Sequence, residues 1–356
     1  MFVRFVLAFV CLLIVAVVGA LVWPETAYER FEPSEAYRDM AERYRIPPMP
    51  PDWREHLFRT DDGTLLRWGE TGNRNAAQVT LLVIPGYTAT LDMYGEHVGR
   101  LAERGYHVMG VDLRGQGQSS RHRPHQPEKL HVDDFSTYSD DLVALIGAVA
   151  PGDTPIVLVG MSFGGHVAMR VGTDHPDVVD GLFLVAPALK PKAGDVDFGT
   201  ALRQMNGMRF IGKSDRYLPG QGNWKPVGDD YTVASQDLCA SNPDRLYLRD
   251  AIFTRQPQQR VGGVTAQWGA EFFESAKYLA RDGRYATLPI PVHMVMAEVD
   301  SFVDNTAISK ACDDIPNCTR KLMPGTGHCL FQESDVVLDE MFDDLGRLVE
   351  RVVSSG

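Results

Sequence analysis

The chain has 356 residues, of which 44% are hydrophobic and 23% are charged, and its formal net charge is -12 at pH 7. This composition is typical of a folded domain and excludes low-complexity disorder. A negative chain repels phosphate backbones and anionic lipids, so we expect neither nucleic-acid binding nor electrostatic attachment to a membrane. Five cysteines without a C-x-x-C pair exclude a disulfide-dense scaffold and a zinc ribbon. These exclusions favour a medium-sized enzyme.

The first feature along the chain is an uncharged, mostly apolar run from Phe5 to Trp23. As a helix this run would be roughly 28 Å long, close to the hydrocarbon thickness of a bilayer. Because Arg4 precedes it, the positive-inside rule places the rest of the chain outside the cytoplasm, in the periplasm if the organism is bacterial. The alternative is a signal peptide cleaved after Val18-Gly19-Ala20. We therefore expect residues 1–23 to be a single-pass transmembrane anchor or that signal peptide, and residues 24–52 to be a tether.

The cysteines are interpreted for an oxidising compartment, where disulfides form. Cys312 and Cys318 lie close together in sequence, at the end of a predicted helix and the start of a predicted strand, and they can close a small disulfide loop. The sequence leaves open whether they do. We expect Cys239 and Cys329 to be buried free thiols, whereas Cys11 belongs to the apolar run.

From about residue 53 onward, strand patterns alternate with helix patterns. The alternation begins with a predicted hairpin around the turn Asp61-Asp62-Gly63. Apolar runs typical of buried parallel strands then alternate with segments of 3.6-residue periodicity. The hairpin strands are 56–60 and 64–70, the further strands 79–84, 106–113, 155–159, 181–185, 291–296 and 319–323, and the helices 93–103, 135–149, 307–314 and 336–353.

These repeated strand–helix units predict an α/β fold with a mostly parallel sheet and helices on both faces. The rhythm stops between about residues 190 and 287, where Pro, Gly, Trp and scattered helical patches replace clear strands. We interpret 190–287 as a cap inserted into a core that comprises residues 53–189 and 288–356.

The strongest motif is Gly160-Met161-Ser162-Phe163-Gly164, which follows an apolar strand and precedes a helix. In this context G-x-S-x-G is a nucleophile elbow, whose tight turn lifts the serine hydroxyl above the sheet. The two glycines keep the junction of strand and helix free of side chains. The simpler interpretation is a helix N-cap serine. We predict that Ser162 is a nucleophile, which then needs a base because the hydroxyl alone is weakly nucleophilic.

The predicted base is His328, which follows the last predicted strand in a Gly-rich segment that can carry it back over Ser162. His166 fits less well, because it lies on the helix after the elbow and points away from the exposed tip of the turn. His293 lies within a predicted strand.

Three carboxylates follow the penultimate predicted strand, namely Glu298, Asp300 and Asp304. Asp300 is the best placed to hold the histidine tautomer and to stabilise the imidazolium. We expect Asp304 to fix the loop, and Glu298 is a less suitable substitute for Asp300. The order Ser162, Asp300, His328 is that of α/β hydrolases, and it differs from the orders of chymotrypsin and subtilisin.

An oxyanion on the substrate needs two backbone donors. We expect one from the N–H of Phe163, directly after the nucleophile, and one from the N–H of Tyr87, in the loop after strand 79–84. No metal or organic cofactor is required by this chemistry.

Two other patterns near the predicted site are interpreted as loops. His122, His125 and His131 cluster after the strand 106–113, but no cysteine or ligand spacing completes a metal site. Gly115 and Gly117 lack the lysine of a phosphate-binding P-loop and are expected to form a structural turn.

These motifs together resemble an α/β hydrolase of the monoacylglycerol lipase and lysophospholipase group. The resemblance covers roughly residues 55–352 and implies an α/β-hydrolase fold and hydrolysis of carboxylic esters with one long acyl chain. One departure is Pro85-Gly86, where the family usually has His-Gly. Because the expected donor is the N–H of Tyr87, the oxyanion hole can still form. Proline lacks an N–H, so it removes one donor from the hydrogen bonds that support this loop. The segments that carry the resemblance are 83–120, 160–165, 300–304 and 327–328, with 241–245 and 262–268 in the cap.

The predicted function is that of a membrane-anchored serine hydrolase which cleaves a lysophospholipid or a monoacylglycerol through an acyl-enzyme. One alternative resembles the proline iminopeptidases, with Asp229 and Asp230 as candidates for binding a substrate amino terminus. A second is a catalytically silent scaffold. Ser162 disfavours dehalogenase and epoxide-hydrolase chemistry, in which a carboxylate takes its place. The oligomeric state stays open. Large apolar cap residues can line an acyl tunnel or form the cap's own core: Met205, Met208, Phe210, Ile211, Trp224, Tyr231, Trp268, Phe272 and Phe273.

Overall fold

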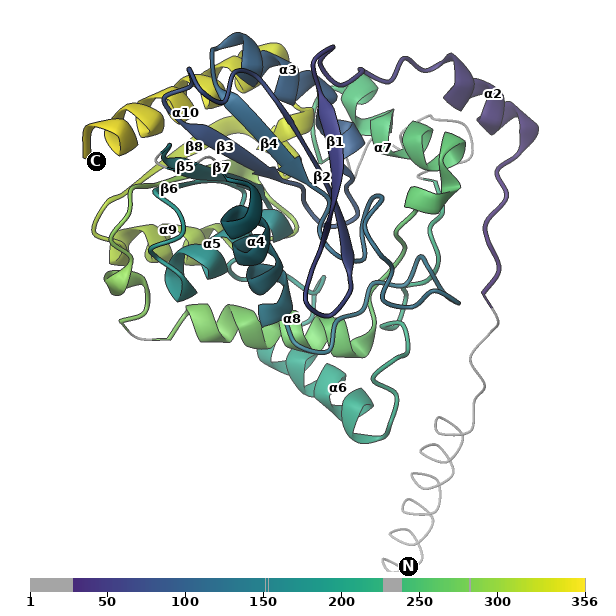
Figure 1. The fold of residues 1–356 in the computed structure, drawn as a ribbon. Helices are drawn as coiled ribbons and strands as arrows, with labels where there is room; N and C mark the ends of the chain where they lie inside the picture. The colour runs from purple at the N-terminus through teal and green to yellow at the C-terminus, as the bar shows by residue number, and fades with distance from the viewer. Residues whose placement is uncertain (1–27, 151, 153, 227–238, 282, 356) are drawn as a thin grey trace, which may run out of the picture.

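The computed structural model describes residues 28–150, 152, 154–226, 239–281 and 283–355. Eight strands form one sheet in the order β1-β2-β4-β3-β5-β6-β7-β8, with helices on both of its faces (Figure 1). β1 and β2 form an antiparallel hairpin, β2 pairs antiparallel with β4, and all later pairings are parallel. The strands are β1 (Arg54–Arg59), β2 (Leu65–Thr71), β3 (Thr80–Ile84), β4 (His107–Val111), β5 (Ile156–Met161), β6 (Gly181–Val185), β7 (Val292–Val299) and β8 (Cys318–Gly327).

Two hydrophobic cores lie on the two faces of this sheet. In β3, Leu81 and Val83 belong to the core under α3 and α10, whereas Leu82 and Ile84 belong to the core that includes α4, α5 and α9. Successive side chains of a strand point to opposite faces, so a continuous apolar run fills both cores. The helices are α2 (Glu35–Arg43), α3 (Gly95–Glu103), α4 (Ser136–Val149), α5 (Phe163–Asp174), α6 (Phe198–Phe210), α7 (Pro243–Arg255), α8 (Ala266–Leu279), α9 (Asn305–Asp314) and α10 (Asp335–Ser355), with short 3-10 helices η1 (Leu91–Tyr94), η2 (Pro257–Gln259), η3 (Tyr285–Thr287) and η4 (Leu330–Gln332).

The predicted parallel strands and core helices are present, with one clear error at β8. The sequence predicted a strand over 319–323 followed by a loop, but β8 continues to Gly327. Its last residue pairs with Val299 of β7 after a shift in register between Ala297 and Val299. Pairing with a neighbouring strand extended β8 through a Pro- and Gly-rich segment, and no local pattern signals such pairing.

Helices α6, α7 and α8 lie between β6 and β7 in sequence and outside the sheet (Figure 1), and we refer to the described residues 190–287 as the cap. The indole N–H of Trp268, on α8, donates to the hydroxyl of Tyr138, on α4, at 2.8 Å. Trp268 and Phe272 pack in the core of the sheet, whereas Met205 and Phe273 belong to a small core of the cap itself. Trp224 packs in the core on the other face of the sheet and Phe210 is exposed, so the large apolar cap residues do not share one core.

Residues 28–52, the described part of the predicted tether, pack against the protein. Helix α2 buries Tyr37 and Ala41 and lies next to α7 (Figure 1). Arg260 donates to the carbonyl of Phe31 at 2.7 Å, and Arg255 donates to carbonyls of residues 41, 42 and 44. None of the helices in the described ranges has the length and apolar character needed to cross a bilayer. The predicted anchor, residues 1–23, falls outside those ranges.

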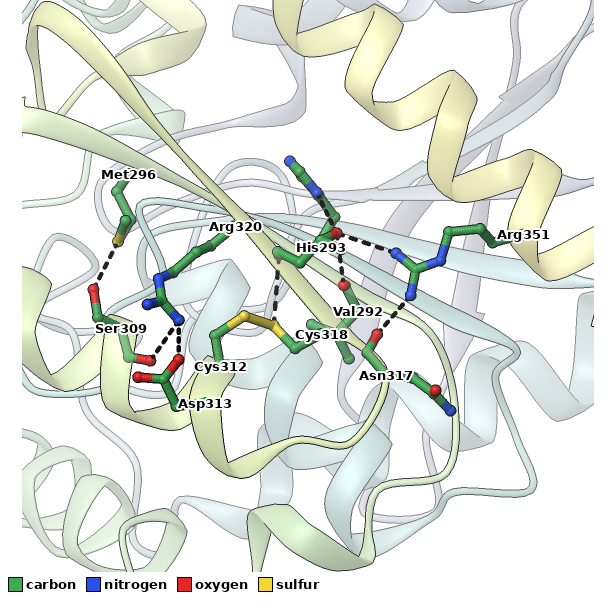
Figure 2. The surroundings of a disulfide bond; sticks show 11 residues. Val292, His293, Met296, Ser309, Cys312, Asp313, Asn317, Cys318, Arg320 and Arg351 are labelled. Carbon is green, nitrogen blue, oxygen red and sulfur yellow. Dashed lines mark hydrogen bonds and ion pairs between the residues drawn. A yellow bond between two sulfur atoms is a disulfide. The ribbon is translucent and has the colours of Figure 1, made fainter.

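Two disulfides join the four cysteines of the described residues. Cys312 and Cys318 are bonded and connect the end of α9 to the start of β8 (Figure 2). Cys239 and Cys329 are also bonded, with their Cα atoms 5.0 Å apart, so our prediction of two free thiols was wrong. They are 90 residues apart, and only the approach of the cap to the loop after β8 brings them together.

Candidate active site

Ser162 lies in the turn between β5 and α5, at the carboxyl end of a central strand. Its φ of 51° falls in the left-handed region, which residues other than glycine rarely adopt. Gly160 and Gly164 make this turn possible. A Cβ on Gly164 would lie 2.5 Å from the carbonyl oxygen of Pro85, and one on Gly160 would lie 2.7 Å from the carbonyl oxygen of Gly164. The elbow is therefore built by backbone packed directly on backbone.

His328 lies immediately after β8 and reaches the elbow. Its Nε2 is 2.8 Å from Ser162 Oγ, and its Nδ1 is 2.7 Å from Asp300 Oδ2. The side chains of His328 and Asp300 are buried. The structure thus brings the predicted nucleophile, base and acid into one chain of hydrogen bonds.

The three predicted carboxylates have different tasks, and Glu298 lies within β7 rather than after it, because β7 continues to Val299. Asp300 Oδ1 accepts from the N–H groups of Phe302 and Val303 at 2.8 and 2.9 Å, which fixes the carboxylate toward His328. Glu298 accepts from the N–H of Gly325 at 2.7 Å, away from His328. Asp304 caps α9 and pairs with Lys190, and this pairing keeps its pKa below the ordinary value. Only Asp300 contacts the histidine.

The histidine loop is tied to the cap. Cys329, directly after His328, is bonded to Cys239, and its N–H donates to the Cys239 carbonyl at 2.7 Å. Gly327 approaches so closely that a Cβ there would lie 2.5 Å from the same carbonyl oxygen. Glu333 accepts from the Gly327 N–H and from the hydroxyl of Ser241. This support was not predicted from the sequence, although a cysteine next to the predicted base was a usable signal.

The predicted oxyanion donors lie on either side of the elbow. A Cβ on Gly86 would lie 3.6 Å from Ser162 Cβ, so the loop after β3 touches the nucleophile. Phe163 is the first residue of α5, and within the described residues neither its N–H nor that of Tyr87 has a protein acceptor. Such unpaired donors are available to an oxyanion.

The side chain of Gln116 supports the predicted oxyanion loop, which is the loop after β3 that contains Pro85. Its Nε2 donates to the Gly86 carbonyl at 3.2 Å, and its Oε1 accepts from the Thr88 N–H at 2.8 Å. The side chain is fully buried and brackets Tyr87 from both sides. We expected Gln116 to lie in a structural turn and did not predict this contact, because a single glutamine in a turn does not indicate its partners.

The remaining histidines have other partners. His166 is fully buried between the Ala188 carbonyl and the hydroxyl of Ser275, and burial lowers its pKa to about 3. His293 contacts Thr319 on the neighbouring strand, and burial lowers its pKa to about 4. Neither side chain contacts Ser162, although the backbone N–H of His166 donates to the Ser162 carbonyl at 3.0 Å at the start of α5.

A histidine cluster does form in the loop after β4. Ligand atoms of His122, His131 and Asp133 lie within 4.8 Å of one another, whereas His125 is not part of the group. The guanidinium of Arg123 lies 3.0 Å from His131 Nε2, and its positive charge opposes a cation there.

The aromatic cap residues approach the nucleophile from the side of α8. The ring of Phe163 packs against Trp268 and Phe272 at 5.3 and 5.7 Å between centroids. The ring of Phe302 lies 4.9 Å from that of His328 and is half exposed. Tyr231, a predicted tunnel residue, lies outside the described residues.

This arrangement can carry out nucleophilic catalysis. A serine held in an elbow, a histidine within hydrogen-bonding distance and a buried carboxylate behind the histidine are the parts needed to deprotonate a hydroxyl as it attacks. The adjacent backbone donors can stabilise negative charge on an attacked carbonyl oxygen.

Comparisons with known proteins identify a family and several relatives. Residues 75–335 match the family described as serine aminopeptidase, S33. Lysophospholipase L2 of Escherichia coli K12 is 29% identical over 249 residues, which cover 65% of this chain and 67% of that protein.

Among solved structures, a soluble variant of a monoglyceride lipase from Saccharomyces cerevisiae superposes with a TM-score of 0.66 at 18% identity, covering 87% of this chain and 99% of the other. A membrane phospholipase A, described as a bacterial virulence factor, covers 98% of both chains with a TM-score of 0.55 at 20% identity. These likenesses establish the α/β-hydrolase fold.

Proposed function

The chain belongs to the serine aminopeptidase S33 family and is a carboxylic ester hydrolase of the α/β-hydrolase fold, and from this premise we propose that it cleaves lipid esters with a single acyl chain. A lysophospholipid or a monoacylglycerol is the expected substrate. The observation that carries the proposal is the continuous hydrogen-bond chain from Ser162 through His328 to Asp300.

In the proposed mechanism, Ser162 Oγ attacks the ester carbonyl while His328 Nε2 takes its proton. Asp300 holds the other ring nitrogen, so the histidine keeps the tautomer that can accept a proton and is stabilised when charged. His328 then returns the proton to the leaving alcohol. The 2.8 Å and 2.7 Å contacts support this relay.

We assign the N–H groups of Tyr87 and Phe163 as the donors that stabilise the tetrahedral oxyanion. The unpaired donors and the clamp by Gln116 support this assignment, because a preorganised donor does not have to reorient during the reaction. The resulting acyl-enzyme is hydrolysed by water, with His328 acting as the base.

A peptidase activity is the second candidate, because the family is described as a serine aminopeptidase. Such an enzyme needs carboxylates that bind the substrate amino terminus. The candidates for that task, Asp229 and Asp230, lie outside the described residues. We rank this activity below the esterase because the sequence relative is a lysophospholipase.

We also place the catalytic domain outside the cytoplasm, on an anchor formed by residues 5–23. The apolar run and the preceding Arg4 support an anchor, and the two disulfides support an oxidising compartment. An anchored enzyme with its substrate in the same bilayer does not need to attract lipid by a positive surface.

The proposal is tested with the full-length protein in non-ionic detergent, beside Ser162→Ala. We would measure hydrolysis of a lysophospholipid, a monoacylglycerol, a short-chain aryl ester and an aminoacyl amide, and labelling by a fluorophosphonate probe. We expect turnover of at least one lipid ester and a fall in kcat on the order of 10⁴-fold or more in the alanine variant.

Turnover of the amide alone would favour the peptidase. A folded wild-type protein that neither turns over any ester nor takes up the probe would instead be a silent scaffold, and the proposal would be wrong.

A further inference from the structure

One cationic side chain reaches the oxyanion loop from the cap. Arg249, on α7, has its Nη1 3.4 Å from the hydroxyl oxygen of Thr88. Thr88 directly follows Tyr87, and the same loop touches Ser162 through Gly86. The guanidinium thus lies at the edge of the candidate active site, next to the loop that would hold the substrate carbonyl.

The position of Arg249 is set by contacts on one side of its guanidinium. Its Nε lies 3.3 Å from Asp250 Oδ1. Asp250 is buried and accepts from the hydroxyl of Tyr37, on α2, through its other oxygen at 3.3 Å. The packing of α2 on α7 therefore holds the carboxylate that orients the arginine.

Arg249 differs from the two other arginines of α7 that make tertiary contacts. Arg245 forms ion pairs with Glu96 and Asp335, and Arg255 donates to the backbone of residues 41–44. Arg249 instead keeps 30% of its side chain exposed, and within the described residues its Nη2 has no acceptor. It therefore has hydrogen-bond donors left for a ligand.

The charge of Arg249 acts electrostatically on the oxyanion loop. Burial raises the pKa of the Tyr87 phenol, and the Arg249 guanidinium opposes that rise. A cation at this edge repels a substrate ammonium group and attracts an anion. Arginine is well suited to phosphate, because its planar fork can donate two parallel hydrogen bonds.

We propose that Arg249 binds the head-group phosphate of a lysophospholipid whose ester carbonyl lies at Ser162, an assignment that rests on the function proposed above. In such a lipid a glycerol unit separates the ester from the phosphate, so the phosphate lies beside the oxyanion loop rather than within it. A monoacylglycerol has the same ester and the same glycerol but no phosphate. Arg249 thus selects between the two substrate classes that the triad cannot tell apart.

The test compares 1-oleoyl lysophosphatidylglycerol with 1-oleoylglycerol, using full-length wild type, Arg249→Gln and Arg249→Lys in non-ionic detergent. We expect Arg249→Gln to lower kcat/KM for the phospholipid about tenfold to a hundredfold, and to change that for 1-oleoylglycerol less than twofold. Arg249→Lys, which keeps the charge without the fork, should fall between. Lys310→Gln, which removes an exposed charge on α9, is the matched control and should change neither rate.

Equal losses on both lipids would overturn the assignment, because they would mean that Arg249 only supports Thr88. No loss on either lipid would overturn it as well.

A second measurement separates this assignment from the proposed function. Hydrolysis of a short-chain aryl ester is followed with added sn-glycerol 3-phosphate, glycerol or inorganic phosphate. We expect inhibition by glycerol 3-phosphate that is absent in Arg249→Gln and is not reproduced by glycerol. If neither lipid is cleaved but this inhibition is present, the function fails and the phosphate site stands. Equally strong inhibition by inorganic phosphate would reduce it to a general anion site and overturn the head-group assignment.

Discussion

The nucleophile elbow and the histidine loop meet at one hydrogen bond, but they are held in different ways. Ser162 is fixed by the core, where Gly160 and Gly164 let strand, helix and neighbouring loop pack backbone against backbone. His328 follows β8, an edge strand of the sheet, and is fixed by the cap through Cys239 and through Ser241, which donates to Glu333.

This difference indicates which part of the molecule each half of the site depends on. A change in the core around the elbow alters backbone that the whole sheet shares. A change in the contacts between cap and histidine loop leaves the sheet intact but loosens the base. In the proposed mechanism the cap therefore helps to position the base.

Among changes outside the hydrogen-bond chain from Ser162 to Asp300, the largest effect is expected from Gly164→Ala. The added methyl group would lie 2.5 Å from the Pro85 carbonyl oxygen and still closer to that of Ile84, so the strand end that leads to Tyr87 must move. We expect a fall in kcat/KM of about 10²-fold, because displacements of about 1 Å have that cost, and a loss of roughly 1–3 kcal/mol in the free energy of unfolding.

The matched control is Gly147→Ala, on α4, where a Cβ has open space around it. It should leave activity unchanged and slightly raise the melting temperature, since alanine favours a helix over glycine. Wild-type activity in Gly164→Ala would show that the elbow tolerates displacement, contrary to this interpretation.

A smaller effect on activity is expected from the double variant Cys239→Ser, Cys329→Ser. Loss of the link between cap and histidine loop should lower kcat about tenfold with little change in KM, because His328 spends less time in hydrogen-bonding geometry with Ser162. The bond closes a loop of 90 residues, so chain entropy predicts a loss of about 4–5 kcal/mol in the free energy of unfolding. Steady-state kinetics and denaturant unfolding check the two effects separately.

The smallest effect is expected from Cys312→Ser, Cys318→Ser. This bond joins α9 to the start of β8 (Figure 2). His328 follows the other end of the strand. It spans only six residues, for which chain entropy predicts about 2 kcal/mol. Neighbouring contacts also remain, including the 2.6 Å bond from Arg351 to the Asn317 carbonyl. We expect kcat within twofold of wild type below the melting transition; an equal loss of kcat in both double variants would contradict a special role for Cys239 and Cys329.

Much of the fold was predictable because its signals are local. Buried parallel strands such as β3 and β6 appear as short apolar runs, and the glycines around Ser162 mark a turn that few other sequences allow. The order Ser162, Asp300, His328 indicated which side chains meet, since the carboxyl ends of neighbouring parallel strands share one edge of the sheet. The structure places these three within hydrogen-bonding distance.

The supports of the site were not predictable in this way. Gln116 holds the Tyr87 loop from 28–30 residues along the chain, and Arg249 reaches the same loop from 161 residues away. Cys239 meets Cys329 across 90 residues. Glutamine and arginine are common in ordinary turns and helices, so the type of Gln116 or Arg249 alone carries no signal. The cysteine next to the predicted base was a signal, but it did not indicate which residue it bonds.

The sequence by itself therefore determined the alternation of strands and helices, the elbow and the identity of the side chains that meet at it, because each depends on residues adjacent in the chain or on the fixed order of parallel strands. Only the tertiary structure decided the extension of β8, the disulfide behind His328, the clamp on the oxyanion loop and the cation beside it. The extension of β8 depends on its pairing with β7, and the clamp depends on the approach of the loop after β4 to the loop after β3. The disulfide and the cation depend on the approach of the cap to the core. The free energy of such packing is spread over many contacts between segments that are distant in sequence.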